Sequence, residues 1–387
     1  MQEGTIHPIE ALKLSFQKVE DFRKPQGKEF DLHELIAASI LSVLCGADDF
    51  VGMSGFCKEK SGFLSDYFSF PRPPSHDLFR RVYAHIKPEE FYHFFVEWTG
   101  VFSRLFPGQV VAIDGKALRA TRENGKACSA IYIVSAWASQ NGLALGQVKA
   151  DKKSNEKTAI PKLLKLLNLT NCIVTIDAMG AHPPIAQNIL DQDGDYLLSL
   201  KKNNKTFFLE VESFFENFKG EKTIMHDFAE EKVEAHGRLE YRKCYTLTAL
   251  EYLPDAVLWP KLNCLVCIES QRTIKGKTTM ENRYYVSSLE PDATKVLQAT
   301  KNHWGIENNL HWRLDVTFNE DKCRTKFQNC PENLAAARKI ALAVLDADTS
   351  RIGGKNKRLK AAWNNNCLLY TSPSPRDRTR SRMPSSA

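Results

Sequence analysis

Two aspartates each come directly after a short run of apolar residues. Asp114 follows VVAI and Asp177 follows VTI, so each stands at the carboxyl end of an expected buried strand. An acidic residue in that place often does no more than begin a turn. If the two strands are neighbours, however, their ends bring two carboxylates together at the edge where open α/β sheets bind ligands. Carboxylates held close together repel one another, and a divalent cation that prefers oxygen ligands, such as Mg²⁺ or Mn²⁺, relieves that repulsion.

A third acidic residue comes from the segment HWGIENNLHWRLDVTFNED. Glu307 directly follows Ile306, which begins an apolar stripe at steps of four that continues through Leu310, Leu314 and Phe318. The spacing predicts a helix whose stripe packs in the core, with Glu307 at the edge of the stripe and able to face the sheet. An exposed helical glutamate is the simpler alternative. The same segment holds three competing acids, Asp315, Glu320 and Asp321.

Zinc is an alternative ligand for two groups of residues. His303, Glu307 and His311 recur at steps of four and fall on one helix face. Cys264 and Cys267 form a C-x-x-C pair in NCLVCIES, a segment typical of a buried strand. One such pair without a second is a weak zinc signal, and the ten cysteines are scattered, as reduced cytosolic thiols usually are.

The elements that would position the two aspartates follow a regular order. Strands are predicted over 109–118, 127–139 and 142–150, the last two joined by a hairpin at the sequence QNG. A helix (160–169), a strand (171–180), a helix (183–192) and a strand (195–203) come next. Three antiparallel strands followed by strands with helical crossovers predict an α/β fold with a mixed sheet flanked by helices.

The segments around this α/β pattern have different patterns. Residues 1–105 are predicted to be an all-helical N-terminal domain, with helices over 32–47, 75–86 and 88–106. The main domain spans 106–350 and contains a β-rich insertion at about 222–290. Helices resume after Pro291, the last of them over roughly 331–347, and a basic segment follows at 351–366.

Composition excludes several protein classes. The chain has 387 residues, of which 43% are hydrophobic and 26% charged, as in an ordinary globular protein rather than a disordered one. No apolar run approaches the ~20 residues of a membrane span, and the first residues lack the features of a signal peptide. We therefore expect a cytoplasmic protein without a membrane partner. The net charge of +7 hints at a polyanionic partner, although alone it decides little.

The last 21 residues differ from the rest in composition. From position 367 the sequence CLLYTSPSPRDRTRSRMPSSA is rich in Ser, Pro and Arg. A disordered basic tail is one interpretation. Its first eleven residues, however, resemble one reading frame of an adapter used in sequencing libraries. We therefore expect 367–387 to be a foreign, adapter-derived tail and exclude it from fold reasoning.

Six motifs in chain order resemble those of a known family. They are AIDGKALR, TIDAMGAHPPIAQNIL, DYLLSLKKNN, EAHGRLEYRKC, RYYVSSL and HWGIENNLHWRLDVTFNEDKCR. Together they resemble the H-repeat-associated transposases, which are DDE insertion-sequence transposases with an RNase H-like catalytic core. The resemblance runs from about residue 20 to 366. It includes an N-terminal part (DFRKPQGKEFDLHELI, then SHDLFRRVYAHIKPEEF) that is similar to the helical transposase-associated domain.

The resemblance implies a catalytic role for the three acids singled out above. Asp114, Asp177 and Glu307 would form the DDE triad and hold two Mg²⁺ or Mn²⁺ ions about 3.5–4 Å apart, with Asp114 bridging both. The implied reaction is cleavage of DNA phosphodiesters at insertion-sequence ends and strand transfer, without a covalent protein–DNA intermediate. Nine basic residues are candidate DNA contacts: Lys116, Arg119, Lys201, Lys202, Lys205, Arg238, Arg242, His303 and Arg313.

The family resemblance also implies partners and leaves alternatives open. The expected partner is double-stranded DNA, both transposon ends and target, bound by a homodimer in the nucleoid. An RNase H-like nuclease would cut DNA without joining ends. A catalytically inactive or truncated remnant would only bind DNA, and a small-molecule metal hydrolase would need neither the basic strand ends nor the insertion.

Overall fold

The computed structural model describes residues 8–25, 28–102, 105–122, 130–150, 156–218, 225–235, 237–248 and 250–365. The suspected adapter-derived tail at 367–387 lies outside these residues. No helix in the described part of the chain is long and apolar enough to cross a membrane.

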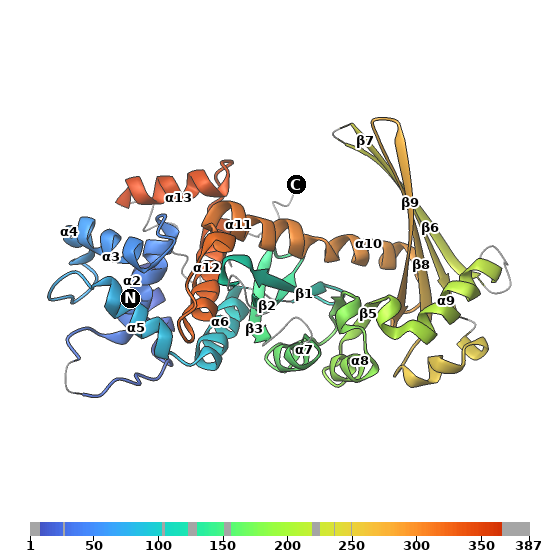
Figure 1. Cartoon of the computed structure of the whole chain (residues 1–387), viewed down its shortest axis with the longest axis horizontal. Helices are drawn as coiled ribbons and strands as arrows, with labels where there is room; N and C mark the ends of the chain where they lie inside the picture. The colour runs from blue at the N-terminus through green and yellow to red at the C-terminus, as the bar shows by residue number, and fades with distance from the viewer. Residues whose placement is uncertain are drawn as a thin grey trace, which may run out of the picture.

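A mixed sheet forms in the order that the hydrophobic runs predict. Its elements are β1 (Val110–Leu118), β2 (Ile131–Ala138), β3 (Leu143–Ala150), α7 (Glu156–Leu164), β4 (Ile173–Ile176), α8 (Pro183–Leu190) and β5 (Asp195–Leu200). β1 pairs with β2 in antiparallel and with β4 in parallel orientation, and β4 pairs with β5 in parallel. The expected α/β fold with an RNase H-like mixed sheet is therefore confirmed (Figure 1).

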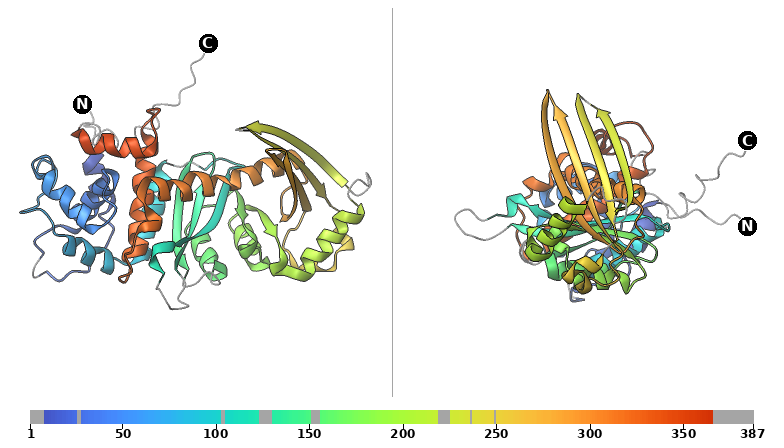
Figure 2. Two further views of the ribbon diagram at one scale, coloured as in Figure 1. Left: turned by 45° about the horizontal axis from the view of Figure 1, so that its top comes forward. Right: turned by 90° about the vertical axis from the view of Figure 1, so that its right-hand side faces the viewer.

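The β-rich insertion continues the same sheet. It follows α9 (Lys205–Phe218) and consists of β6 (Met225–Ala235), β7 (Arg238–Leu247), β8 (Cys264–Ile274) and β9 (Lys277–Ser287). The strand order is β3-β2-β1-β4-β5-β9-β8-β7-β6, so β9 pairs directly with β5 and Leu200 lies opposite Tyr284. The long strands of the insertion twist away at one end of the molecule (Figure 2).

Helices cover both faces of the sheet. On one face α7, α8 and α9 pack against the strands and share an apolar core with them. The other face is crossed by a continuous helical run made of α10 (Ala293–His303), the π-helical turn η7 (Ile306–His311) and α11 (Trp312–Phe318) (Figure 1). The predicted stripe of Ile306, Leu310, Leu314 and Phe318 is fully buried in this run.

The described residues of the N-terminal part form six helices. They are α1 (Pro8–Ser15), α2 (Leu32–Leu44), α3 (Phe50–Glu59), α4 (Ser61–Leu64), α5 (His76–His85) and α6 (Pro88–Phe102). Asp31, Asp49 and Ser75 cap the N-termini of α2, α3 and α5 with side-chain oxygens. These helices share one buried core with α12 (Cys330–Ala347), whose Asn333 amide donates to the carbonyl of Tyr83 (2.8 Å).

The remaining elements are short or lie at the end of the described chain. Single turns occur at η1 (Arg119–Thr121), η3 (Ala178–Gly180), η4 (Lys202–Asn204), η5 (Leu250–Tyr252), η6 (Pro254–Leu258) and η8 (Glu320–Lys322). The basic segment after 350 forms α13 (Gly354–Trp363). Its Arg358 is buried and donates to the carbonyl of Val43 at the end of α2 (2.7 Å), which fixes α13 onto the helical core.

Candidate active site

The register of β1 and β4 places two carboxylates side by side. Ile113 pairs with Ile176 in parallel orientation, so the next residues, Asp114 and Asp177, lie at the same level on adjacent strands. Neighbouring strands are about 4.8 Å apart. Side chains alternate between faces along a strand, and Ala112 packs with the core under the helical run. Asp114 therefore points to the face that α10 and η7 cross.

Glu307 reaches the same place from the π-helical turn. η7 interrupts the α-helical run directly after Trp304 and Gly305, and such turns often occur at functional sites. Gly305 allows a close approach to the sheet, because a Cβ atom there would lie 3.3 Å from Trp137 Nε1. The hydroxyl of Ser139, the residue after β2, donates to the carbonyl of Asn302 (2.8 Å) and anchors the end of α10.

One pocket of about 130 Å³ brings the three acids together. Its wall consists of residues from β1, β4, β5 and β9 and from the helical run. The lining side chains are Asp114, Thr175, Ile176, Asp177, Leu197, Ser199, Lys201, Arg283, Tyr285, Thr300, His303, Trp304 and Glu307. The three acids that the sequence singled out thus share one pocket, whereas Asp315, Glu320 and Asp321 do not line it.

Two histidines of the helical run contact residues of the sheet at this site. His303 Nδ1 lies 2.9 Å from the Thr175 hydroxyl on β4, and His311 Nδ1 lies 3.4 Å from a carboxylate oxygen of Asp114. Burial lowers the pKa of His303 to about 4 and that of His311 to about 3. Both imidazoles are therefore neutral at pH 7 and act as hydrogen-bonding groups rather than as cations.

Arg283 is a site residue that the sequence reasoning missed. Leu200, the last residue of β5, pairs with Tyr284 of β9. Lys201, the residue after β5, therefore comes beside Arg283, the residue before Tyr284. The Arg283 guanidinium lies over the Trp304 ring, 4.8 Å from its centroid, and both side chains line the pocket. Arg283 is the first residue of the motif RYYVSSL, but only the β5–β9 pairing shows that this motif reaches the site.

The electrostatics of the pocket fit a bound divalent cation. Burial raises the pKa of Glu307, and the Asp177 carboxylate raises it further, while Arg283 and Lys201 lower it. A cation among the three carboxylates would offset the cost of burying the Glu307 charge and the repulsion between Glu307 and Asp177. Within the described residues no three His, Cys, Asp or Glu lie close enough together to hold a metal ion as they stand. The pocket instead offers hard oxygen ligands as separate groups, which suits Mg²⁺ or Mn²⁺.

Five of the nine predicted DNA-contact residues form ion pairs within the protein, and Lys116 and Arg313 are the least exposed of these five. Lys116 Nζ lies 2.7 Å from Glu320 and also bonds Asp315, and only 12% of its side chain is exposed. Arg313 forms a two-pronged ion pair with Asp346. Their partners come from distant parts of the sequence, so spacing alone gave no sign of these contacts. We do not include either residue in the proposed DNA surface.

The other predicted basic residues lie at or near the surface. Lys201 lines the pocket and is exposed, and Lys202 and Lys205 follow it on the surface. Arg119 is 79% exposed beside Asp321. Arg238 and Arg242 lie on β7, where both pair with Glu240 (2.9 and 2.6 Å).

The C-x-x-C pair does not converge on a common point. Cys264 and Cys267 both lie on β8, and their odd spacing sends the two thiols to opposite faces of the sheet. Cys264 joins the core beneath α10, whereas Cys267 joins the core of α7 and α9. Burial raises the pKa of the Cys264 thiol to about 12. This pair therefore packs as small apolar side chains rather than as a chelate.

Two family models match most of the chain. The family described as "Transposase DDE domain" matches residues 105–344, and "DDE_Tnp_1-associated" matches residues 14–99. The chain is 35% identical to "Putative protein YbfL" and to "H repeat-associated putative transposase YhhI", both of Escherichia coli strain K12. Each match covers 90% of this chain and 94% of the relative.

Other similarities are weaker or shorter. The chain is 34% identical over 225 residues to "H repeat-associated putative transposase YbfD" of Escherichia coli strain K12, covering 58% of this chain and 88% of that protein. A cryo-EM structure of a piggyBac transposase synaptic complex with hairpin DNA superposes with a TM-score of 0.43 and 13% identity, over 99% of this chain and 83% of that one. That likeness is too low to carry an argument. The two family models together match most of the chain, and its relatives match it over 90% of its length. This chain therefore belongs to the DDE-domain transposases and is related to the H repeat-associated proteins.

Proposed function

We propose that this transposase cleaves DNA phosphodiesters at insertion-sequence ends and transfers the freed strands to target DNA. Asp114, Asp177 and Glu307 would hold two divalent ions, Mg²⁺ or Mn²⁺. The observation that carries the proposal is the pocket itself. Three carboxylates from three separate elements line it together with the cationic side chains of Lys201 and Arg283. Acidic groups for a metal and basic groups for a phosphate are what phosphodiester chemistry requires.

The acidic and the basic residues of the pocket would have different roles. When bound, two such ions supply activation of the attacking oxygen and stabilisation of the leaving oxygen. Lys201 and Arg283 would neutralise the phosphate that enters the pocket. The planar guanidinium of Arg283 lies over Trp304 and forms a two-pronged ion pair with Glu281 (3.0 and 2.9 Å). A phosphate that enters the pocket would replace this carboxylate on the same paired donors.

The histidines would position rather than protonate. His303, fixed by Thr175, can donate or accept one hydrogen bond toward DNA in its neutral form. His311 lies against Asp114 and would restrict the rotation of that carboxylate. The His311 contact would keep Asp114 ordered before substrate binds, which is how supporting residues commonly assist a metal site.

The surface cations extend the proposal to the rest of the substrate. We propose that Lys202, Lys205 and Arg119 contact phosphates beside the pocket, and that Arg238 and Arg242 on the insertion contact DNA further away. Handling two ends at once calls for a homodimer on double-stranded DNA. Such a protein would work in the cytoplasm, associated with the nucleoid.

A strand-transfer assay tests the proposal against its rivals. The substrate is a labelled duplex that carries the inverted repeats flanking the gene, with Mn²⁺ and a supercoiled plasmid as target. A transposase yields both cleaved ends and labelled plasmid. Cleavage without joining would indicate an RNase H-like nuclease, and binding without cleavage would indicate an inactive remnant. Either result would contradict the proposal.

A further inference from the structure

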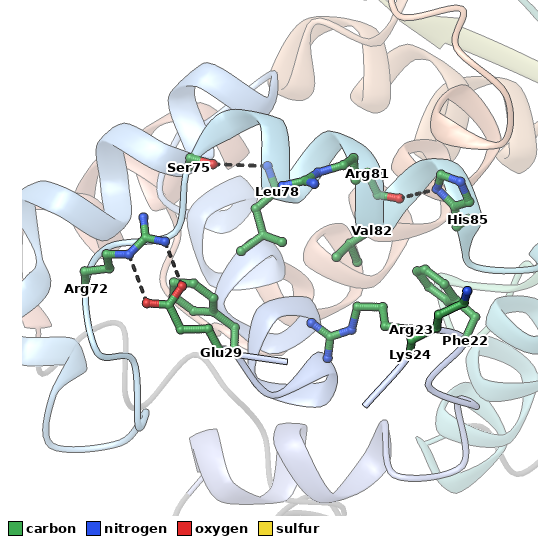
Figure 3. Close-up of a pocket in the computed structure, with 11 residues that line it drawn as sticks. Phe22, Arg23, Lys24, Glu29, Arg72, Ser75, Leu78, Arg81, Val82 and His85 are labelled. Atoms are coloured by element: carbon green, nitrogen blue, oxygen red, sulfur yellow. Dashed lines mark hydrogen bonds and ion pairs between the residues drawn. The ribbon is translucent and has the colours of Figure 1, made fainter. Parts of the chain in front are cut away.

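A second basic cleft lies in the N-terminal helical part, among residues that the proposed chemistry does not use. It has a volume of about 330 Å³ and is lined by residues 22–24 and 29–30 of the segment DFRKPQGKEF, by Arg72, and by α5 with its N-cap Ser75 (Figure 3). The segment is part of one of the motifs noted in the sequence. The residues that line the cleft are Phe22, Arg23, Lys24, Glu29, Phe30, Arg72, Ser75, Leu78, Arg81, Val82 and His85.

Two of its four arginine and lysine side chains are already neutralised. Arg72 forms a two-pronged ion pair with Glu29, at 3.0 and 2.7 Å, on one side of the cleft (Figure 3). Arg23 forms a similar pair with Asp21, at 2.8 and 2.9 Å. The carboxylate of Glu29 is the single acidic group among the described lining residues, and it is taken up by Arg72.

The other two cations have no acidic partner within the described residues. Lys24 and Arg81 line the cleft from the loop and from α5, and both are exposed. The backbone carbonyl of Arg81 accepts a hydrogen bond from His85 Nδ1 (2.8 Å), a contact that does not involve the guanidinium. Two unpaired positive charges in one concave site favour a ligand with two negative charges.

One wall of the cleft is flat and aromatic. The Phe22 ring stacks on His85, with centroids 5.6 Å apart and an angle of 20° between the rings. The stack stands beside the loop that carries Lys24, as Figure 3 shows. The cleft therefore combines an aromatic wall with the two unpaired cations.

We propose that this cleft binds the phosphate backbone of duplex DNA, away from the catalytic pocket. Successive phosphates offer charges at a regular spacing, and Lys24 and Arg81 would each take one. The choice of DNA over another polyanion rests on the proposed function, whereas the need for an anion rests on the charges of the cleft. Binding of this kind is independent of base sequence, because phosphates carry no sequence information.

The test measures binding without cleavage. The full-length protein is titrated into a fluorescent 40-bp duplex of random sequence, with a chelator present, over a series of salt concentrations. The double variant Lys24→Ala/Arg81→Ala is compared with Lys58→Ala/Arg351→Ala, which removes two exposed cations elsewhere. The cleft variant should bind roughly ten-fold more weakly at 0.1 M salt, and its salt slope should fall by about 2, whereas the control stays near wild type.

A gain of charge makes the test sharper. Glu29→Gln releases Arg72, which the Phe30 ring still orients at 5.6 Å. This variant should bind the duplex more tightly and with a steeper salt slope, a result that loss of folding cannot produce. Thermal melting of each variant checks that the fold is intact.

The outcomes separate this inference from the catalytic proposal. If the cleft double variant binds like wild type, or if the control weakens equally, the cleft does not contact DNA. Unchanged DNA binding would also be the result if the cleft takes an acidic protein segment instead. Because no cleavage is required, the inference can hold even if the chain proves inactive, and it can fail while cleavage is normal.

Discussion

The guanidinium of Arg283 lies over the indole of Trp304, 4.8 Å from the ring centroid, within the pocket that contains Glu307. Arg283 comes from the last strand of the insertion, and Trp304 comes from the end of α10. The contact therefore joins the insertion to the helix that carries the third acid. The insertion is therefore part of the wall of this pocket as well as an extension of the sheet.

Removing that guanidinium should slow DNA cleavage without unfolding the protein. We expect Arg283→Ala to reduce single-turnover cleavage roughly 10- to 100-fold, because a preorganised donor to the phosphate is lost. Arg283→Lys should recover only part of the rate, since an ammonium lacks the paired donors. Arg272→Ala, on β8 and 49% exposed, is the control and should cleave normally. If Arg283→Ala cleaves DNA at the wild-type rate, Arg283 does not contact the phosphate during cleavage.

Gly180 should tolerate no side chain. It ends the turn after Asp177, and a Cβ atom there would lie 2.5 Å from Ile176 Cγ2 and 2.6 Å from Ile160 Cδ1. We expect Gly180→Ala to lower the free energy of unfolding by about 1–3 kcal/mol through overpacking. Urea denaturation measures this loss in the free energy of unfolding. The control is Gly55→Ala, in α3 with no atom within 4 Å, which should be neutral or slightly stabilising.

Lys116 should prove structural rather than DNA-binding. It pairs with Glu320, which is only 1% exposed. Burial alone would raise the pKa of the Glu320 carboxyl, but Lys116 and other nearby cations lower this pKa to about 2. Lys116→Ala leaves that charge buried without its nearest partner, so we expect a loss of about 3–5 kcal/mol of stability. The affinity of the folded fraction for duplex DNA should stay unchanged. If Lys116→Ala is as stable as wild type but binds DNA more weakly, Lys116 contacts DNA and this prediction is wrong.

Glu332 should make stability fall as pH rises. Burial raises the pKa of its carboxyl to about 8, and the Glu89 carboxylate adds to the effect. Between about pH 4.5 and 8 the folded state keeps a proton that the unfolded chain has lost, so unfolding is favoured as pH increases. Glu332→Gln removes this dependence and should gain about 1–3 kcal/mol over wild type between pH 5 and 8.5. Glu59→Gln, on the exposed end of α3, should show no such gain.

Much of the sheet was predictable because local patterns determine it. The apolar runs before Asp114 and Asp177 mark the strands, and the parallel pairing of Ile113 with Ile176 brings the two acids together as expected. The stripe that begins at Ile306 predicted a buried helix, although its first turn is π-helical rather than regular α-helix.

What the sequence could not show depends on contacts between distant segments. Arg283 reaches the pocket only because β9 pairs with β5, more than 80 positions away in the chain. Lys116 and Arg313 likewise find their partners, Glu320 and Asp346, across the fold. A basic residue near a candidate site can therefore be a ligand contact or a buried ion pair, and only packing distinguishes the two.

The central claim is that Asp114, Asp177 and Glu307 together support metal-dependent DNA cleavage. The most direct test is single-turnover cleavage of the inverted-repeat duplex in Mn²⁺ by wild type, Asp114→Asn, Asp177→Asn and Glu307→Gln. The control is Asp191→Asn, on the exposed end of α8. The account predicts that each triad variant loses at least about 1,000-fold in rate while it still binds the duplex, and that the control cleaves normally. Cleavage at the wild-type rate by any one of the three triad variants would contradict it.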